Sequence, residues 1–240
     1  MKLRTLQRIL SKLPAEPKNI KYDHIQSLYT DQNWPHEFAK SKDYIEELEA
    51  AGLYKSSAIC RYYSTDVVDR AKLIDSGYRL KALDGDDMKS SLPELTKNQN
   101  IKYCSYVLGS LLLQAYPENG LEKLKFALDD VPQARYLYCQ HLLKASRKVE
   151  VSILLNSIAD LTTQDLFFLS LAESDRAKSL NCLVESAEGG LMEAQYNLGC
   201  LYLEGKLNGT KQQAQSWFYL SAFQGHQASL KNLQQFMASK

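Results

Sequence analysis

An excess of charge of one sign is absent from this sequence. Its 240 residues carry 29 lysines and arginines against 28 aspartates and glutamates, a formal net charge of +1. Nucleic-acid binding relies on clustered basic residues that neutralise phosphates. The balance therefore argues against a nucleic-acid partner, including an RNA bound along a helical array.

Patterned cysteines and long apolar runs are missing as well. The five cysteines include no C-x-x-C pair, so we expect free thiols rather than a disulfide framework or a structural zinc site. No apolar stretch reaches transmembrane length, and the start, MKLRTLQRILSKLPAEP, interrupts its apolar positions too often for a secretory leader. We therefore expect a soluble, cytoplasmic protein.

Catalytic signatures are also absent. The sequence has no H-E-x-x-H, no G-x-S-x-G and no phosphate-binding glycine loop, and its four histidines lack metal-ligand spacing. Asp84, Asp86 and Asp87 do not have the spacing of a calcium loop and predict a solvated turn. Cys139 and His141 are two residues apart, so on a helix they point to different sides. We predict no catalytic residue, no metal and no cofactor.

What the sequence does contain is helical periodicity. Segments such as VVDRAKLIDSGYRLKAL and KVEVSILLNSIADL place apolar residues three and four positions apart, and short polar breaks with glycine or proline separate them. Strand-like alternation is lacking, so the predicted fold class is all-α. Residues 86–102 interrupt the pattern and predict an extra short helix or a bend.

The first thirteen residues predict a basic amphipathic helix. Leu3, Leu6, Leu10 and Leu13 share one side of it, with lysines and arginines on the others. Such a helix could lie on a membrane surface. We favour the alternative that the leucine stripe packs on the rest of the fold.

An internal repeat runs through the second half of the chain. Four aromatic residues stand in equivalent settings at intervals of 30, 31 and 29 residues: Tyr106, Tyr136, Phe167 and Tyr196. Each is followed three positions later by a small residue: Gly109, Cys139, Ser170 and Gly199. A second helix in each unit is predicted to carry an alanine near its end: Ala127, Ala159, Ala187 and Ala222.

Gly199 lies inside a predicted helix, where glycine costs about 1 kcal/mol relative to alanine. We interpret it as a packing notch that lets two helix backbones approach closely while large neighbours are buried. Gly205 and Gly225 follow the ends of helical stretches and predict left-handed helix C-caps. Thr210 is the predicted N-cap of the next helix.

The segment from Ser186 to Leu233 resembles a Sel-one-like repeat, a relative of the tetratricopeptide repeat. The resemblance is specific over about one and a half repeats, and upstream only the notch and aromatic positions agree. The matched residues are Ala194, Tyr196, Leu198, Gly199, Tyr202, Gly205, Ala214, Trp217, Ala222, Gly225 and His226.

The resemblance implies a right-handed α-solenoid of antiparallel helix pairs that forms a single domain over residues 1–240. Solenoids need capping helices because each repeat buries its apolar faces only against its neighbours. We expect N-terminal capping helices in 1–50, degenerate repeats in 51–185, the best repeat in 186–225 and a C-terminal capping helix in 226–240.

By resemblance to tetratricopeptide-like grooves, the first helices of successive units would bind a protein or peptide partner. The residues expected to be exposed there are Gln133, Tyr136, Gln140 and Lys144 in one unit and Glu193, Tyr196, Asn197 and Cys200 in the best repeat. The first hypothesis is therefore a non-catalytic adaptor, with a narrower version in which it inhibits a bacterial toxin or effector as an immunity protein. The alternative is a β-lactam-binding or β-lactam-hydrolysing activity as in cysteine-rich relatives, which the cysteine pattern disfavours.

Overall fold

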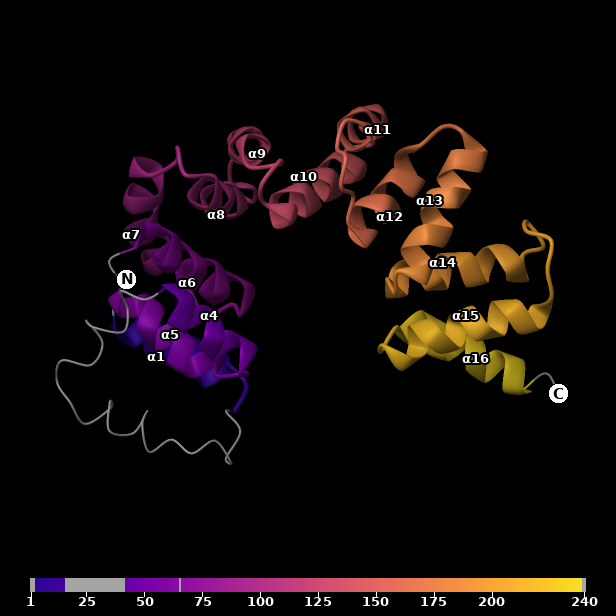
Figure 1. Ribbon diagram of the computed structural model, residues 1–240, viewed down its shortest axis with the longest axis horizontal. Coiled ribbons are helices and arrows are strands. Elements are labelled where there is room, and N and C mark those ends of the chain that lie inside the picture. The colour runs from indigo at the N-terminus through magenta and orange to yellow at the C-terminus, as the bar shows by residue number, and fades with distance from the viewer. Residues whose placement is uncertain (1–2, 16–41, 65, 239–240) are drawn as a thin grey trace. The chain divides into compact units, whose positions relative to one another are not determined.

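The structure is a computed structural model that describes residues 3–15, 42–64 and 66–238. Within these residues the chain forms fourteen helices and no strand (Figure 1), which confirms the predicted all-α class. None of those helices is both long and apolar enough to cross a bilayer. The chain divides into two compact units, residues 1–134 and 135–240.

The first unit contains seven complete helices within its described residues. They are α1 (Leu3–Lys12), α4 (Lys42–Ala50), α5 (Tyr54–Tyr63), α6 (Val67–Arg79), α7 (Gly85–Lys97), α8 (Lys102–Leu112) and α9 (Pro117–Phe126). Helix α7 forms where residues 86–102 predicted an extra short helix or a bend, and with 13 residues it is longer than that prediction. Most of the predicted N-terminal cap lies outside the described residues, which cover only α1, α4 and the residues beside them in 1–50.

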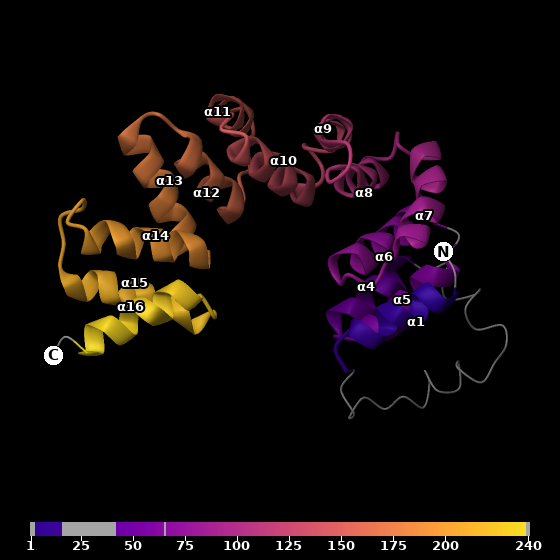
Figure 2. The same cartoon turned by 180° about the vertical axis from the view of Figure 1, so that it is seen from behind.

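The second unit continues from α10 (Pro132–Lys144), whose first turn precedes the unit boundary. Its remaining helices are α11 (Lys148–Asn156), α12 (Thr163–Ala172), α13 (Arg176–Glu188), α14 (Met192–Leu203), α15 (Lys211–Phe223) and α16 (Gln227–Ala238). Helices α14, α15 and α16 lie side by side in both views (Figures 1 and 2).

The apolar face of α1 packs inside the first unit, as we predicted. Leu6 and Ile9 are buried in one cluster with Ala58, Leu73 and Ala82. Leu10 and Leu13 pack against the edge of that cluster. Leu6, Leu10 and Leu13 of the predicted stripe are therefore used for internal packing, and the side chain of Leu3 lies outside the described residues.

Charged side chains fix α1 to the start of α7. Arg8 forms ion pairs with Asp84 and Asp87, and the Thr5 hydroxyl donates to Asp87. The Asp87 amide and the Arg8 guanidinium hold the pKa of Asp84 well below its usual range. The predicted solvated turn is therefore wrong for Asp87, which is buried because it completes a capping box with Asp84 and contacts α1.

The notch predicted at Gly199 is confirmed by the packing of α14 on α15. A Cβ atom added to Gly199 would lie 2.9 Å from two ring carbons of Phe218 and 3.3 Å from the Ala214 carbonyl oxygen. In the α8–α9 pair, a Cβ on Gly109 would lie 2.9 Å from the carbonyl oxygen of Gly120. The counterparts Cys139 and Ser170 are buried as well. A small buried residue therefore recurs on α8, α10, α12 and α14.

Serine hydroxyls make a second contact within two of these pairs. Ser186 of α13 donates to the carbonyl of Thr163, the first residue of α12, at 2.7 Å. Ser221 of α15 donates to the carbonyl of Met192, the first residue of α14, at 2.8 Å. Both serines are fully buried, so each hydroxyl is satisfied by the partner helix.

The predicted helix ends around the best repeat are confirmed. Gly205 and Gly225 have φ angles of +68° and +96°, the left-handed conformation in which glycine avoids the steric cost of a Cβ. Thr210 is the N-cap of α15 and forms a capping box with Gln213. Of the other matched residues, Ala194, Leu198 and Ala214 are buried, and Tyr202, Trp217 and Ala222 are half-buried.

The alanine prediction is wrong at one position. Ala127 and Ala187 are buried and Ala222 is half-buried, but Ala159 is exposed beyond the end of α11. Helix α11 ends at Asn156, where the Ser157 hydroxyl donates to the carbonyl of Leu154 at 2.6 Å. A serine that bonds the local backbone competes with helix continuation.

Replacing Gly199 with alanine should destabilise the protein by about 1–3 kcal/mol, because the new methyl group overpacks against Phe218. Gly85→Ala is the matched control, since a Cβ there would meet nothing within 4 Å. Denaturant unfolding measures both. An unchanged free energy of unfolding for Gly199→Ala would show that the notch does not limit helix approach.

Candidate partner-binding surface

Helix α10 carries a row of polar side chains on its outer side. Gln133, Tyr136 and Lys144 are exposed and Gln140 is half-buried, so the predicted set shares one face. The Gln140 amide donates to the Tyr136 hydroxyl at 3.1 Å and accepts from Lys144 Nζ at 3.5 Å. These bonds align three side chains along the helix without burying them.

Apolar packing supports this row from beneath. The Tyr136 ring lies 5.5 Å from the ring of Phe168 on α12, centroid to centroid. Cys139 and Leu142 of α10 belong to the same buried cluster as Phe168. A ring held by a packed neighbour loses little entropy when it binds a partner.

A buried ion pair fixes α10 against α12. Arg135 donates to Asp165 Oδ2 from Nε at 3.2 Å and from a terminal nitrogen at 3.1 Å. Both side chains are almost fully buried. Asp165 also completes the capping box of α12 with Thr162. The Asp165 carboxylate thus joins the start of α12 to α10.

The predicted set on α14 is less accessible than expected. Glu193, Tyr196, Asn197 and Cys200 are all half-buried. The Tyr196 ring lies 5.8 Å from Phe218 and 4.6 Å from the His226 ring, so the turn before α16 covers part of it. A hydrogen bond with Cys200 raises the pKa of the Tyr196 hydroxyl. Among the described residues, no hydrogen bond, ion pair or ring contact joins this set to the row on α10.

The most exposed apolar residues of the second unit's last two helices were not among the predicted site residues. Tyr219, Leu220 and Phe223 on α15 are 63%, 47% and 85% exposed, and Leu230 on α16 is 45% exposed. The sequence does indicate an exposed apolar surface here. Trp217–Leu220 are four consecutive large apolar residues, and on a helix they cannot all face the core.

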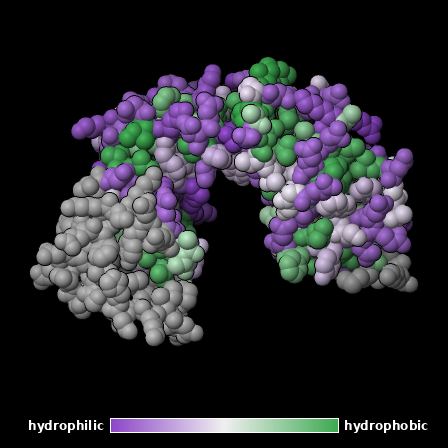
Figure 3. All heavy atoms as spheres, in the orientation of Figure 1, coloured by the Kyte–Doolittle hydropathy of each residue, from purple (hydrophilic) through white to green (hydrophobic). Residues whose placement is uncertain are grey.

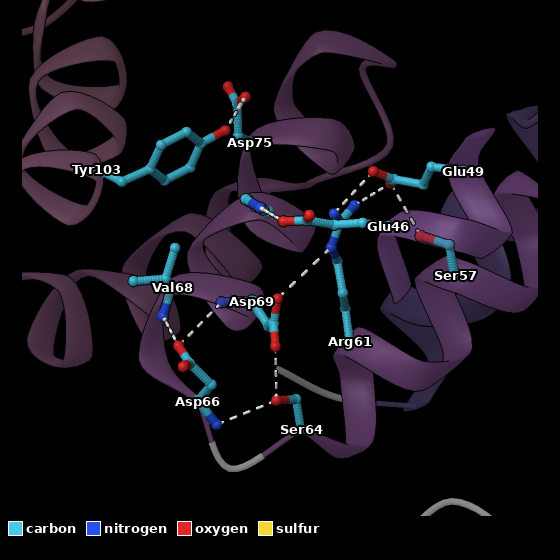
Figure 4. A network of polar contacts seen from close by, with 11 residues as sticks. Glu46, Glu49, Ser57, Arg61, Ser64, Asp66, Val68, Asp69, Asp75 and Tyr103 are labelled. Atoms are coloured by element: carbon cyan, nitrogen blue, oxygen red, sulfur yellow. Dashed lines mark hydrogen bonds and ion pairs between the residues drawn. The ribbon is translucent and has the colours of Figure 1, made fainter. Parts of the chain in front are cut away.

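Buried polar groups in the first unit form a separate cluster (Figure 4). Figure 4 shows the Tyr103 hydroxyl beside Asp75, to which it donates at 3.1 Å. Asp75 also accepts from the Tyr106 hydroxyl at 3.1 Å and pairs with Arg79. Burial and the nearby carboxylate raise the pKa of both tyrosines, which keeps them protonated. Every group in this cluster has a partner, as expected of a structural network.

A second part of Figure 4 shows Arg61 between Glu49 and Asp69. These residues connect α4, α5 and α6. The Arg61 side chain is almost fully buried, and Ser57 also donates to Glu49 at 2.9 Å. The arrangement serves to hold three helices together.

The described residues contain no group of histidine, cysteine and acidic side chains placed to hold a metal ion. All five cysteines are free, and all but the half-buried Cys200 are buried. Burial raises the pKa of the Cys60 and Cys104 thiols to about 11 and that of Cys139 to about 12. Such thiols remain protonated near neutral pH.

Compared with known proteins, the chain matches no family model, no curated protein and no solved structure. The resemblance of Ser186–Leu233 to a Sel-one-like repeat therefore stays a prediction from the sequence.

Removing the Arg135 side chain should be costly. Arg135→Met leaves the Asp165 carboxylate buried without its cation, and we expect a loss of about 3–5 kcal/mol in denaturant unfolding. Arg147→Met, which removes the exposed pair with Glu150, should change stability little. Equal effects of the two substitutions would contradict a structural role for the buried pair.

Thiol reactivity should follow burial. At pH 8, iodoacetamide should modify Cys200 before the other four cysteines, because those four are buried and react as thiolates only after opening. Mass spectrometry of proteolytic peptides over time measures the order. Modification of Cys139 ahead of Cys200 would show that the α10–α12 core opens more readily than the packing indicates.

Proposed function

We propose that this protein is a non-catalytic scaffold that binds a protein or peptide partner. The observation that carries the proposal is the row of Tyr136, Gln140 and Lys144 on α10. Their side chains reach solvent, yet internal hydrogen bonds and the Phe168 ring hold them in place. A pre-ordered surface of aromatic, amide and cationic groups suits protein recognition.

The proposal includes the finer architecture implied by the family resemblance. We propose that the helix pairs form a right-handed α-solenoid in which α10, α12 and α14 are first helices of successive repeats. The recurring notch residues on these helices and the helix ends at Gly205 and Gly225 support that arrangement. First helices of such arrays line an elongated binding surface.

The buried polar groups also favour binding over catalysis. The Asp75 carboxylate and its two tyrosines are saturated by one another and by Arg79. Asp165 is likewise saturated by Arg135 and Thr162. A catalytic group needs an unsatisfied reacting atom facing substrate, and these clusters offer none.

Affinity purification of the tagged chain from its native host tests the proposal. The wild type should recover a partner in stoichiometric amount, and a Tyr136→Ala, Lys144→Ala double variant should recover at least about tenfold less. Lys148→Ala, an exposed change at the start of neighbouring α11, should behave as wild type. The absence of any stoichiometric partner, or equal recovery by all three proteins, would overturn the proposal.

A further inference from the structure

Helices α15 and α16 enclose a hollow on the surface of the second unit. Its volume is about 700 Å³, and its lining includes the apolar residues Tyr219, Leu220, Leu230 and Leu233. A smaller hollow of about 470 Å³ adjoins it and shares Gln212 and Gln215 with it. We name the two together the α15/α16 groove. Figure 3 shows hydrophobic residues reaching the surface of this unit near the turn between the two helices.

The groove has a filled counterpart one repeat earlier. Ser186-Ala187 and Ser221-Ala222 stand 35 residues apart, as do Gly190 and Gly225, so α13 and α14 correspond to α15 and α16. By the same spacing, Gln215, Tyr219 and Leu233 of the groove lining correspond to three residues of the earlier pair: Leu180, Val184 and Leu198.

In the earlier pair, this surface is covered by the following helix. Leu198 is buried in an apolar cluster of α13 and α14, and Leu180, Val184 and Trp217 of α15 are partly buried against that cluster. No helix of the described residues covers α15 and α16 in the same way. The groove therefore has the shape and apolar lining of a site for a helix that presents a large side chain.

The position of the notch explains why the hollow is wide. Gln234 stands 35 residues after Gly199 and is exposed in the groove lining. A glutamine at this position offers no notch like the one that admits Phe218 at Gly199, so a bound helix would stand farther from α16 than α15 stands from α14. A large apolar side chain such as Trp would suit the larger hollow of about 700 Å³.

The positive charge beside the groove indicates which charged residues a bound partner would carry. From Gly205 to Lys240 the sequence contains four lysines and no aspartate or glutamate. Lys211 lines the smaller hollow and Lys231 is exposed on α16, whereas the polar groups of the larger hollow are neutral amides and the hydroxyls of Ser216 and Tyr219. Acidic residues on a bound helix would meet this positive field.

We propose that the α15/α16 groove binds an amphipathic helix of a partner protein, with a Trp or other large apolar residue in the larger hollow and acidic residues beside Lys211 and Lys231. Helix α15 has 13 residues, so it offers about 20 Å of contact and accommodates about three turns. This inference rests on the proposed scaffold function and assigns the class of partner.

Two other occupants fit the groove less well. A second copy of this chain would bring the same lysines against one another, which like-charge repulsion disfavours. A membrane surface would contact protruding side chains such as Phe223, but would leave the concave larger hollow unfilled. A helix that carries both apolar and acidic side chains would fill the larger hollow and pair with the lysines beside it.

A fluorescein-labelled peptide of about 14 residues tests the inference. Its helical design carries one Trp and two Leu on one face and Glu on the others, and a matched peptide has Lys in place of Glu. Fluorescence anisotropy with the full chain should show the acidic peptide binding at least about tenfold more tightly than the basic one. Leu230→Asp should weaken acidic-peptide binding at least about tenfold.

Ile153→Asp is the matched control, because Ile153 is an apolar residue of α11 that is 67% exposed in the same unit. It should bind the peptide within about twofold of wild type. Thermal unfolding checks that each variant is folded, and Tyr219→Ser replaces Leu230→Asp if the latter lowers the Tm. Failure of the acidic peptide to bind, equal binding of both peptides, or equal losses in Leu230→Asp and Ile153→Asp would overturn the inference.

Binding to anionic vesicles that Leu230→Asp abolishes, without peptide binding, would assign the groove to lipid and overturn the inference. A dimer in sedimentation that Leu230→Asp dissociates would assign the groove to a second copy and overturn the inference.

Failure of the groove inference can be distinguished from failure of the proposed scaffold function. If a stoichiometric partner depends on Tyr136 but the peptide does not bind, the groove inference fails alone. If the peptide binds but no stoichiometric partner is recovered, the scaffold function fails alone.

Discussion

Close approach of paired helices at a small residue is the constraint on which the second unit depends. At Gly199 the ring of Phe218 lies 2.9 Å from the place that a Cβ would take, and this contact allows Leu198 and Phe218 to be buried completely. Burial of each such side chain contributes about 1.5–3 kcal/mol, whereas the glycine costs the helix about 1 kcal/mol. The same arrangement at Gly109 and Gly120 shows that the first unit uses it too.

Much of this arrangement follows from local sequence. The spacing of small residues predicts the notch positions, and single residues such as Gly205 and Thr210 predict helix ends, because caps depend on local backbone conformation. The pairing of Arg135 with Asp165 could not be predicted in this way, since the two are thirty residues apart and meet only after α10 packs on α12. For the candidate surface, the exposure of Tyr136 is expected from the resemblance to tetratricopeptide-like grooves, but the half-burial of Tyr196 depends on the distant residues Phe218 and His226.

The first unit buries several carboxylates, whereas the last two helices of the second unit expose large apolar side chains. In the first unit, carboxylates such as Asp75 and Asp87 are buried and join helices that are far apart in the sequence. In the second unit's last helices, large apolar side chains such as Phe223 face solvent and the charges on α15 and α16 are all lysines. Charge thus stabilises one region internally, and apolar surface remains available for contact in the other.

The serine bonds have a consequence for the connection between α14 and α15. Gly199 meets Phe218 at one point along this pair, and Ser221 meets Met192 at another. Two separate points fix both the distance and the crossing angle of the helices without help from the chain that joins them. The loop of residues 204–210 is therefore expected to tolerate changes in length, as long as Gly205 still ends one helix, Thr210 begins the next, and Leu207 and Gly209 keep their close packing. An insertion in this loop that spares those residues is therefore expected to leave the geometry of the α14–α15 pair intact.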